Sequence, residues 1–155
     1  MIRFKLNGKD VESKMLPGAR LIDSIREEFG QIGTKEGCSE GECGACAVLI
    51  DGELVNSCLV ALGSIEGQEI VTIEGYRETK RFMVLDKAYM KTGGVQCGIC
   101  TPGMILASEA LLAKTPHPSR EEVKVGLAGN LCRCTGYNMI VDAVIEAAEE
   151  GDGLW

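Results

Sequence analysis

The sequence predicts an α+β protein in which a strand-rich first half is followed by an all-helical second half. Three observations predict this fold class. Apolar residues alternate in the first half, which also contains two dipeptides suited to tight hairpin turns, whereas apolar residues recur every three or four positions after Phe82. Eight cysteines fall into two groups of four, one group in each half. We therefore predict two domains, residues 1–76 and residues 77–155.

The first half is predicted to contain two hairpins and a closing strand. Ile2, Phe4 and Leu6 alternate with polar residues, as expected for a half-buried strand. Asn7-Gly8 favours a two-residue turn into a second strand, and Asp51-Gly52 favours the same turn in the next hairpin. The predicted strand segments are residues 2–6, 11–15, the two arms of 47–58, and 68–75.

One helix is predicted before the first cysteine group and four in the second half, each with apolar residues on one face. Gly30 suits the end of the first helix, and Ser119 with Glu122 forms a capping-box pattern. Residues 75–80 are predicted to be a linker, and residues 151–155 a mobile tail. The predicted helical segments are residues 19–30, 82–91, 101–114, 119–129 and 137–150.

Composition and charge exclude several classes of protein. Hydrophobic residues make up 45% of the chain and charged residues 25%, which is ordinary for a soluble globular protein. No apolar stretch approaches the roughly 20 residues that span a bilayer, so we expect no membrane segment. The formal charge is -7 and the Lys and Arg residues are scattered, so we expect no nucleic-acid partner. No secretory leader pattern precedes the first strand, and we expect a cytoplasmic protein.

The first cysteine group has the pattern Cys-x4-Cys-x2-Cys, followed after eleven residues by a fourth cysteine. This is the spacing with which plant-type ferredoxins hold a 2Fe–2S cluster through four thiolates. Glycines between the cysteines let the backbone curl around a cluster, and the exposed amides can then donate to its sulfurs. The predicted ligands are Cys38, Cys43, Cys46 and Cys58, and the loop glycines are Gly37, Gly41 and Gly44.

The second cysteine group consists of two pairs, each directly before a predicted helix. Pro102 suits the first turn of one of these helices, and Gly98 gives the loop before it a tight backbone. Because helix N-termini favour negative charge, two of them facing one anionic cluster form a suitable site. The spacing leaves open which two cysteines share an iron. The predicted ligands are Cys97, Cys100, Cys132 and Cys134.

Disulfides and zinc are the alternative interpretations of eight cysteines. Disulfide frameworks are typical of small secreted proteins, but this chain is long enough to bury a core without them. Structural zinc also accepts four thiolates, usually at Cys-x2-4-Cys spacings, whereas Cys132 and Cys134 are separated by one residue. The spacings therefore favour iron–sulfur clusters.

Other catalytic chemistry is not indicated. His117, the one histidine, is flanked by prolines and is expected to be a surface residue. Neither the P-loop pattern nor the dinucleotide-binding glycine pattern occurs. We therefore expect no catalytic residue and no flavin, nucleotide or molybdenum site on this chain.

Four motifs, KEGCSEGECGACAVLIDG, NSC, VQCGICTPGM and GNLCRCTGY, carry a resemblance to a known family. From about Ile2 to Ala148, the chain resembles the small iron–sulfur subunit of the molybdenum hydroxylases, the xanthine dehydrogenase and aldehyde oxidoreductase family. The resemblance implies a β-grasp, plant-type ferredoxin-like domain followed by an all-α four-helix-bundle iron–sulfur domain. It also implies that Cys38 and Cys43 ligate one iron of the first cluster, and Cys46 and Cys58 the other.

The same resemblance implies partners and a direction of electron flow. A large subunit would hold a molybdenum-pterin cofactor and a medium subunit FAD, and this chain would relay electrons from the first to the second through two 2Fe–2S clusters. Gln96 and Cys134 match the positions that lie against the pterin. Arg133 lies between two thiolates and either offsets cluster charge or is simply solvated.

Two other functions stay open at this stage. One is a free-standing two-cluster ferredoxin, although a soluble carrier needs only the first half. The other is a zinc-stapled scaffold. The substrate of the complex, whether a purine, nicotinate, an aldehyde, carbon monoxide or an aromatic acyl-CoA ester, is not indicated, because its pocket would lie in the large subunit.

Overall fold

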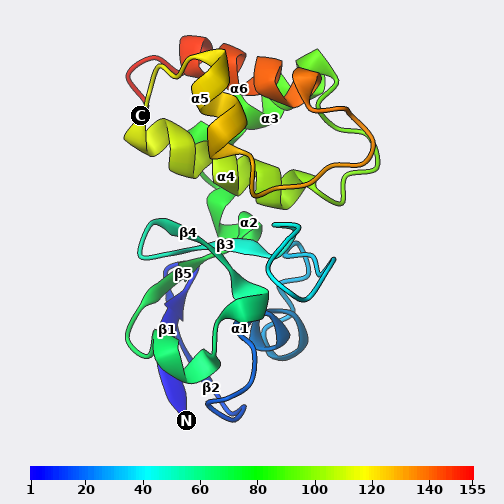
Figure 1. The fold of residues 1–155 in the computed structure, drawn as a ribbon. Coiled ribbons are helices and arrows are strands. Elements are labelled where there is room, and N and C mark those ends of the chain that lie inside the picture. Colours follow the sequence, from blue (N-terminus) through cyan, green and yellow to red (C-terminus); the bar gives the residue numbers. More distant parts are fainter.

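The computed structural model describes residues 1–155 and places a five-stranded sheet beneath a layer of helices (Figure 1). The sheet has the order β2-β1-β5-β3-β4. β1 and β5 are parallel, and every other neighbouring pair is antiparallel. The strands are β1 (Ile2–Leu6), β2 (Lys9–Ser13), β3 (Ala47–Ile50), β4 (Glu53–Asn56) and β5 (Glu69–Val71).

Both predicted hairpin turns are confirmed. Asn7 and Gly8 have φ angles of 52° and 77°, and Asp51 and Gly52 have 48° and 86°. Positive φ at both central residues defines the type I′ turn, which matches the twist of the flanking strands. Because a two-residue turn returns the chain at once, β2 begins at Lys9, two residues before the predicted start of that strand.

One helical segment packs beneath the sheet, but it is not a uniform α-helix. It consists of α1 (Leu21–Asp23) and the π-helical turn η1 (Ser24–Glu28), in which the Phe29 N–H donates to the Ser24 carbonyl at 3.0 Å. Leu21 and Ile25 on its predicted apolar face are buried. Gly30 has a φ of 66° and ends the segment as predicted.

The second half is helical, as predicted. The observed bounds of α4 coincide with the prediction, and the capping box of α5 is present. In that box the Ser119 hydroxyl accepts from the Glu122 N–H at 3.3 Å, and the Glu122 carboxylate accepts from the Ser119 N–H at 2.7 Å. The helices that follow the sheet are α2 (Ile73–Tyr76), at the end of the first half, and, in the second half, α3 (Lys80–Thr92), α4 (Thr101–Lys114), α5 (Arg120–Gly126) and α6 (Asn138–Glu150). No helix is both long enough and apolar enough to cross a bilayer.

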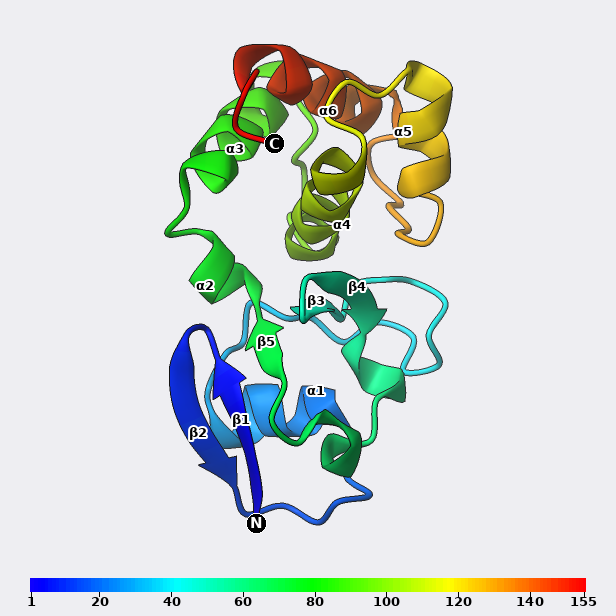
Figure 2. The same ribbon diagram turned by 90° about the vertical axis from the view of Figure 1, so that its left-hand side faces the viewer.

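The two halves share a boundary at β3, all four residues of which are buried. Val48 and Ile50 belong to the core between the sheet and α1, whereas Leu49 belongs to the core of the helical half. Successive side chains of a strand point to opposite faces, so β3 contributes to both cores. α4 packs directly against β3 and β4, which joins the helical layer to the sheet (Figure 2).

Three expectations are wrong. The closing strand, predicted over residues 68–75, ends at Val71, and Ile73–Tyr76 form α2 instead. Part of the predicted linker is therefore helical, and Tyr76 is buried in the core of the helices. The C-terminal tail, predicted to be mobile, is packed. The Trp155 Nε1 donates to the Glu109 carboxylate at 2.7 Å, and the Arg81 Nε donates to the Leu154 carbonyl at 2.7 Å.

Candidate functional site

The first cysteine group lies at the end of the sheet that faces the helices. Cys38, Cys43 and Cys46 are on the loop between η1 and β3, and Cys58 is in the short turn η2 (Ser57–Leu59) that follows β4. Figure 2 shows this loop and turn on the same side of the sheet. The fold thus brings together in space a loop and a hairpin end that are separated in the sequence by the strands β3 and β4.

Backbone amides surround the sulfur of Cys38. The N–H groups of Glu40, Cys43 and Glu42 donate to its Sγ at 3.5, 3.4 and 3.3 Å. Because these hydrogen bonds favour the thiolate, they lower the pKa of the Cys38 thiol to about 7. Amide donors directed at a ligand sulfur are the usual surroundings of an anionic iron–sulfur site.

The four thiols of the first group form two close pairs. Cys38 lies close to Cys43, and Cys46 lies close to Cys58. Cys46 and Cys58 are buried, and burial, together with the neighbouring Cys58, raises the pKa of Cys46 to about 11. The pairing coincides with the two iron-sharing pairs that the family resemblance implies.

The loop glycines permit close approaches that a side chain would prevent. Gly41 and Gly44 have φ angles of 79° and 73°, in the left-handed region that favours glycine. At Gly37 the φ is ordinary, but a Cβ atom would lie 2.8 Å from the Cys43 sulfur. All three positions therefore require glycine for the loop to keep its path around the cysteines.

The second cysteine group lies on two neighbouring loops of the helical half. Cys97 and Cys100 are on the loop between α3 and α4, and Cys100 is the residue that caps α4. Cys132 and Cys134 are on the loop between α5 and α6. We predicted that each pair of cysteines lies at a helix N-terminus, and Cys100 lies directly at the N-terminus of α4.

These four thiols also form two pairs. Cys100 lies close to Cys132, and Cys97 lies close to Cys134. Burial and the nearby Cys132 raise the pKa of Cys100 to about 12, and the nearby Cys97 raises the pKa of Cys134. One pair faces the interior of the helices, and the other is exposed.

Hydrogen bonds hold the loop around Cys132. The Thr135 hydroxyl donates to the Cys132 Sγ at 3.2 Å, and the same oxygen accepts from the Tyr137 N–H at 3.2 Å. The Tyr137 phenol oxygen accepts from the Cys132 N–H at 3.1 Å. Burial opposes the ionisation of Cys132, but its hydrogen bonds, with that from the Thr135 hydroxyl the largest among them, leave its pKa lowered.

The donor sets fit binuclear iron–sulfur groups. Each group offers four thiols in two close pairs, and two adjacent irons with all-thiolate ligation require such a donor set. The Thr101 hydroxyl, directly after Cys100, is buried and has no hydrogen-bond partner within the chain. Since an unpaired buried hydroxyl is unfavourable, an acceptor held by the adjacent cysteines would satisfy it.

The two cysteine groups are joined by a short contact between their loops. The Leu131 N–H donates to the Cys43 carbonyl at 2.9 Å, and the Asn130 amide donates to the Gly44 carbonyl at 3.1 Å. A Cβ on Gly103 of α4 would overlap the same Gly44 carbonyl oxygen. Both ribbon views place these loops next to each other (Figures 1 and 2).

The remaining predicted residues lie at the surface. Gln96 is exposed beside Cys97, and Arg133 is exposed between Cys132 and Cys134. Gly98, with a φ of 85°, forms the turn between Cys97 and Cys100. His117 is exposed, as predicted, and its Nε2 lies 3.2 Å from the Asp152 carboxylate.

Sequence reasoning missed the residues that support the second site. Asn130 and Thr135 are buried polar residues next to the cysteines, and Tyr137 has an unusual φ of 72° for a residue with a side chain. The one available signal was their presence inside the GNLCRCTGY motif. Their roles depend on contacts across a loop, which no spacing rule describes.

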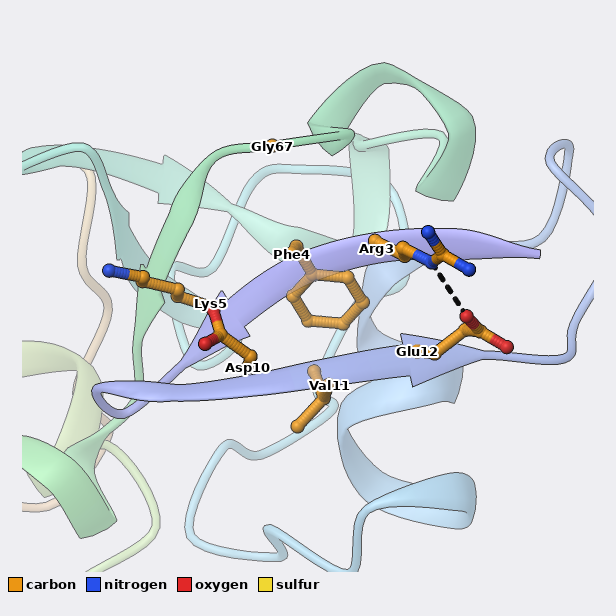
Figure 3. A pocket seen from close by; sticks show the side chains of 7 residues that line it. All are labelled: Arg3, Phe4, Lys5, Asp10, Val11, Glu12 and Gly67. Atoms are coloured by element: carbon orange, nitrogen blue, oxygen red, sulfur yellow. Dashed lines mark hydrogen bonds and ion pairs between the residues drawn. The ribbon is translucent and has the colours of Figure 1, made fainter.

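Pockets elsewhere on the molecule contain no cysteine. A pocket of about 430 Å³ over β1 and β2 is lined largely by charged side chains, including the Arg3–Glu12 ion pair at 2.7 Å (Figure 3). A second cavity, of about 380 Å³, is mainly apolar and is bounded by Leu131 and Tyr137. Neither offers a set of groups for catalysis.

Two family models match consecutive parts of the chain. Residues 4–70 match a 2Fe-2S iron-sulfur cluster binding domain, and residues 72–145 match a 2Fe-2S binding domain. Each half of the molecule therefore matches a domain described as binding this cluster.

Similar proteins are iron–sulfur subunits of oxidoreductases. The nicotinate dehydrogenase small FeS subunit of Eubacterium barkeri is 47% identical, over 96% of this chain and 94% of that one. The xanthine dehydrogenase iron-sulfur-binding subunit of Escherichia coli O157:H7 is 46% identical, over 94% and 92%.

Solved structures have the same fold. Quinoline 2-oxidoreductase from Pseudomonas putida 86 superposes with a TM-score of 0.90 and 41% identity, over 96% of this chain and 93% of the matched chain. Aldehyde oxidoreductase from Desulfovibrio gigas superposes with a TM-score of 0.91 and 39% identity, over all of this chain but 18% of that much longer one. The mixed α/β arrangement predicted from the sequence is thereby confirmed.

Proposed function

We propose that this chain is the electron-transfer subunit of a heteromeric molybdenum hydroxylase and carries two 2Fe–2S clusters. The chain belongs to the family of small iron–sulfur subunits of xanthine dehydrogenase- and aldehyde oxidoreductase-type enzymes. The observation that carries the proposal is the arrangement of the eight thiols as two sets of two close pairs. Each set lies within a segment that matches a 2Fe–2S-binding domain.

In this proposal each close pair of cysteines ligates one iron. The domains are residues 1–76, a β-grasp ferredoxin-like domain, and residues 77–155, a four-helix bundle. The parallel pairing of β1 with β5 and the packing of α3 against α6 and α4 support these assignments. The first cluster takes Cys38 with Cys43 and Cys46 with Cys58, and the second takes Cys100 with Cys132 and Cys97 with Cys134.

A bound 2Fe–2S cluster supplies one-electron redox chemistry at a potential set by its surroundings. The residues of this chain hold the thiolates, donate amide hydrogen bonds to them, and exclude water from Cys46 and Cys58. The hydrogen bond from the Leu131 N–H to the Cys43 carbonyl gives a short connection between the two ligand sets, because Leu131 is bonded to Cys132 and Cys43 is itself a proposed ligand. The chain thereby relays electrons between its two ends.

The partners in this proposal are a large subunit that holds a molybdenum-pterin cofactor and a medium subunit that holds FAD. The exposed thiol pair of Cys97 and Cys134, with Gln96 beside it, supports the placement of the pterin at the second site. The first site then faces FAD. A cytoplasmic location belongs to the same proposal, since cysteines that ligate clusters rather than form disulfides are usual in a reducing compartment.

Metal analysis combined with spectroscopy tests the cluster assignment. We expect about four irons and four sulfides per chain, from two all-thiolate 2Fe–2S sites, and two electron paramagnetic resonance signals after reduction. Zinc in place of iron would instead identify a zinc-stapled scaffold.

Copurification at native expression tests the partners. A tag on this chain should recover a molybdenum protein and a flavoprotein, or one chain that holds both cofactors. If the chain purifies alone and exchanges electrons with soluble donors, it is a free-standing two-cluster ferredoxin.

A further inference from the structure

The second cysteine group contains a hydrogen bond from a side-chain hydroxyl to a sulfur. The Thr135 hydroxyl donates to the Cys132 Sγ at 3.2 Å. By contrast, the Cys38 sulfur of the first group receives its hydrogen bonds from backbone amides. A backbone donor is present whatever the residue, but a hydroxyl donor depends on the residue type.

Local contacts hold the Thr135 hydroxyl in this orientation. Its oxygen accepts the Tyr137 N–H at 3.2 Å, so its own proton is free to point toward the Cys132 sulfur. Tyr137 in turn has a φ of 72°, and its phenol oxygen accepts the Cys132 N–H. Thr135 and Tyr137 therefore hold the sulfur and the backbone amide of Cys132, respectively.

The environment makes the hydrogen bond electrostatically effective. Thr135 is buried, with 8% of its surface exposed, so water does not replace its hydroxyl at the sulfur. Reduction adds a negative charge that spreads over the sulfurs, and a donor to one of them stabilises the reduced state more than the oxidised state.

We propose that Thr135 is a positioning residue whose hydroxyl raises the reduction potential of the second cluster through its hydrogen bond to Cys132. This inference rests on the proposed function, because it requires a cluster at the second cysteine group. It adds that the residue at position 135 helps to determine which of the two clusters is reduced more readily.

The test is a redox titration of the holo-complex, followed by the separate paramagnetic signals of the two clusters. The Thr135→Val variant keeps the volume and removes the donor, so reduction of the second cluster should become less favourable by about tenfold, or about 59 mV for a one-electron couple. The first cluster should not shift. Thr135→Ser, which keeps the hydroxyl, should restore the potential of the second cluster.

A matched control is Thr92→Val in the same half. The Thr92 hydroxyl shares its proton between the Ala88 and Met139 carbonyls, at 3.0 and 2.9 Å, and donates to no sulfur, so its removal should leave both potentials unchanged. An unshifted second cluster in Thr135→Val, an equal shift of both clusters, or an equal shift in Thr92→Val overturns the proposal.

Two further outcomes separate potential from assembly. If Thr135→Val does not assemble the second cluster, the smaller Thr135→Ala is titrated with the same expectation. Loss of the cluster from both, with retention in Thr135→Ser, assigns the hydroxyl to assembly and overturns its role in the potential. Wild-type protein without iron at the second site refutes the proposed function itself, whereas two clusters with unshifted potentials refute Thr135 alone.

Discussion

Replacement of the buried carboxylate of Glu109 should destabilise the helical half strongly. Glu109 lies in α4 and accepts the Tyr76 hydroxyl at 2.5 Å, the Trp155 Nε1–H at 2.7 Å and an Arg81 N–H at 2.8 Å. Burial and the neighbouring carboxylate raise the pKa of Tyr76, so its phenol stays protonated and remains a donor. One side chain thus connects α2, α3, α4 and the C-terminal tail.

The magnitude follows from the donors that Glu109→Leu leaves without an acceptor. Tyr76 is 4% exposed, and an unsatisfied buried donor costs about 1–3 kcal/mol. Trp155 is partly buried and adds a similar or smaller amount, whereas Arg81, whose side chain is 39% exposed, can turn to water and adds little. The expected loss is therefore about 3 kcal/mol, a large share of the 5–15 kcal/mol that is typical of whole domains.

The assay is the thermal loss of visible absorption from the holo-protein at one fixed scan rate, because unfolding with cluster loss is irreversible. For a reversible transition in a chain of this size, about 3 kcal/mol corresponds to a midpoint lowered by about 6–12 °C, and we expect a shift of that order between variants compared at the same scan rate. Glu109→Gln is the matched control: its amide oxygen can still accept from Tyr76 and Trp155, so it should lose less than half as much. A midpoint within about 2 °C of wild type in Glu109→Leu would refute the assignment of this carboxylate as a satisfied, stabilising acceptor.

Three further predictions concern the candidate sites. Cys43→Ser should abolish the paramagnetic signal of the first cluster only, and Cys132→Ser that of the second only; loss of both signals from a folded variant would contradict two independent ligand sets. Gly103→Ala should cost about 1–3 kcal/mol, because its Cβ would overlap a carbonyl oxygen of the first cysteine loop, whereas Gly129→Ala, whose Cβ meets nothing within 4 Å, should be near wild type in the same thermal assay. Gln96→Ala should slow electron arrival from the molybdenum site in stopped-flow reduction by substrate, with both clusters still assembled; an unchanged rate would remove Gln96 from the path.

Local signals in the sequence account for the elements that were predicted well. Asn7-Gly8 and Asp51-Gly52 determine their turns because few other residues adopt positive φ at low cost. The start of α4 was predictable because Pro102 suits the first turn of a helix. Spacing predicted the division of the cysteines into two groups of four, since a loop that must wrap a small inorganic core allows few spacings. The pairs within the first group came from the family resemblance, and spacing left those of the second group open.

Long-range contacts explain what the sequence did not predict. Trp155 is ordered by Glu109, 46 residues away, and nothing near Trp155 in the sequence indicates this. A signal was nevertheless present: Glu109 is the one acidic residue in the apolar α4 segment, and a charge in a buried helix requires partners. Likewise, Leu49 packs on the helices, and the unbroken apolar run Ala47–Ile50 is the signal of a strand that is buried on both faces.

The contact between the cysteine loops indicates why the two halves are held so closely. Gly44 needs its left-handed φ to shape the first loop, but a Cβ there would also lie 2.5 Å from the Gly129 carbonyl of the second loop. Gly103 meets the same loop from α4, and the Asn130 amide is the one side chain that completes the contact. The distance between the two cysteine groups is therefore determined by contacts between backbone atoms, which a change of side-chain rotamer cannot relieve. In the proposed function, the glycines at this boundary would therefore also constrain the distance between the two clusters.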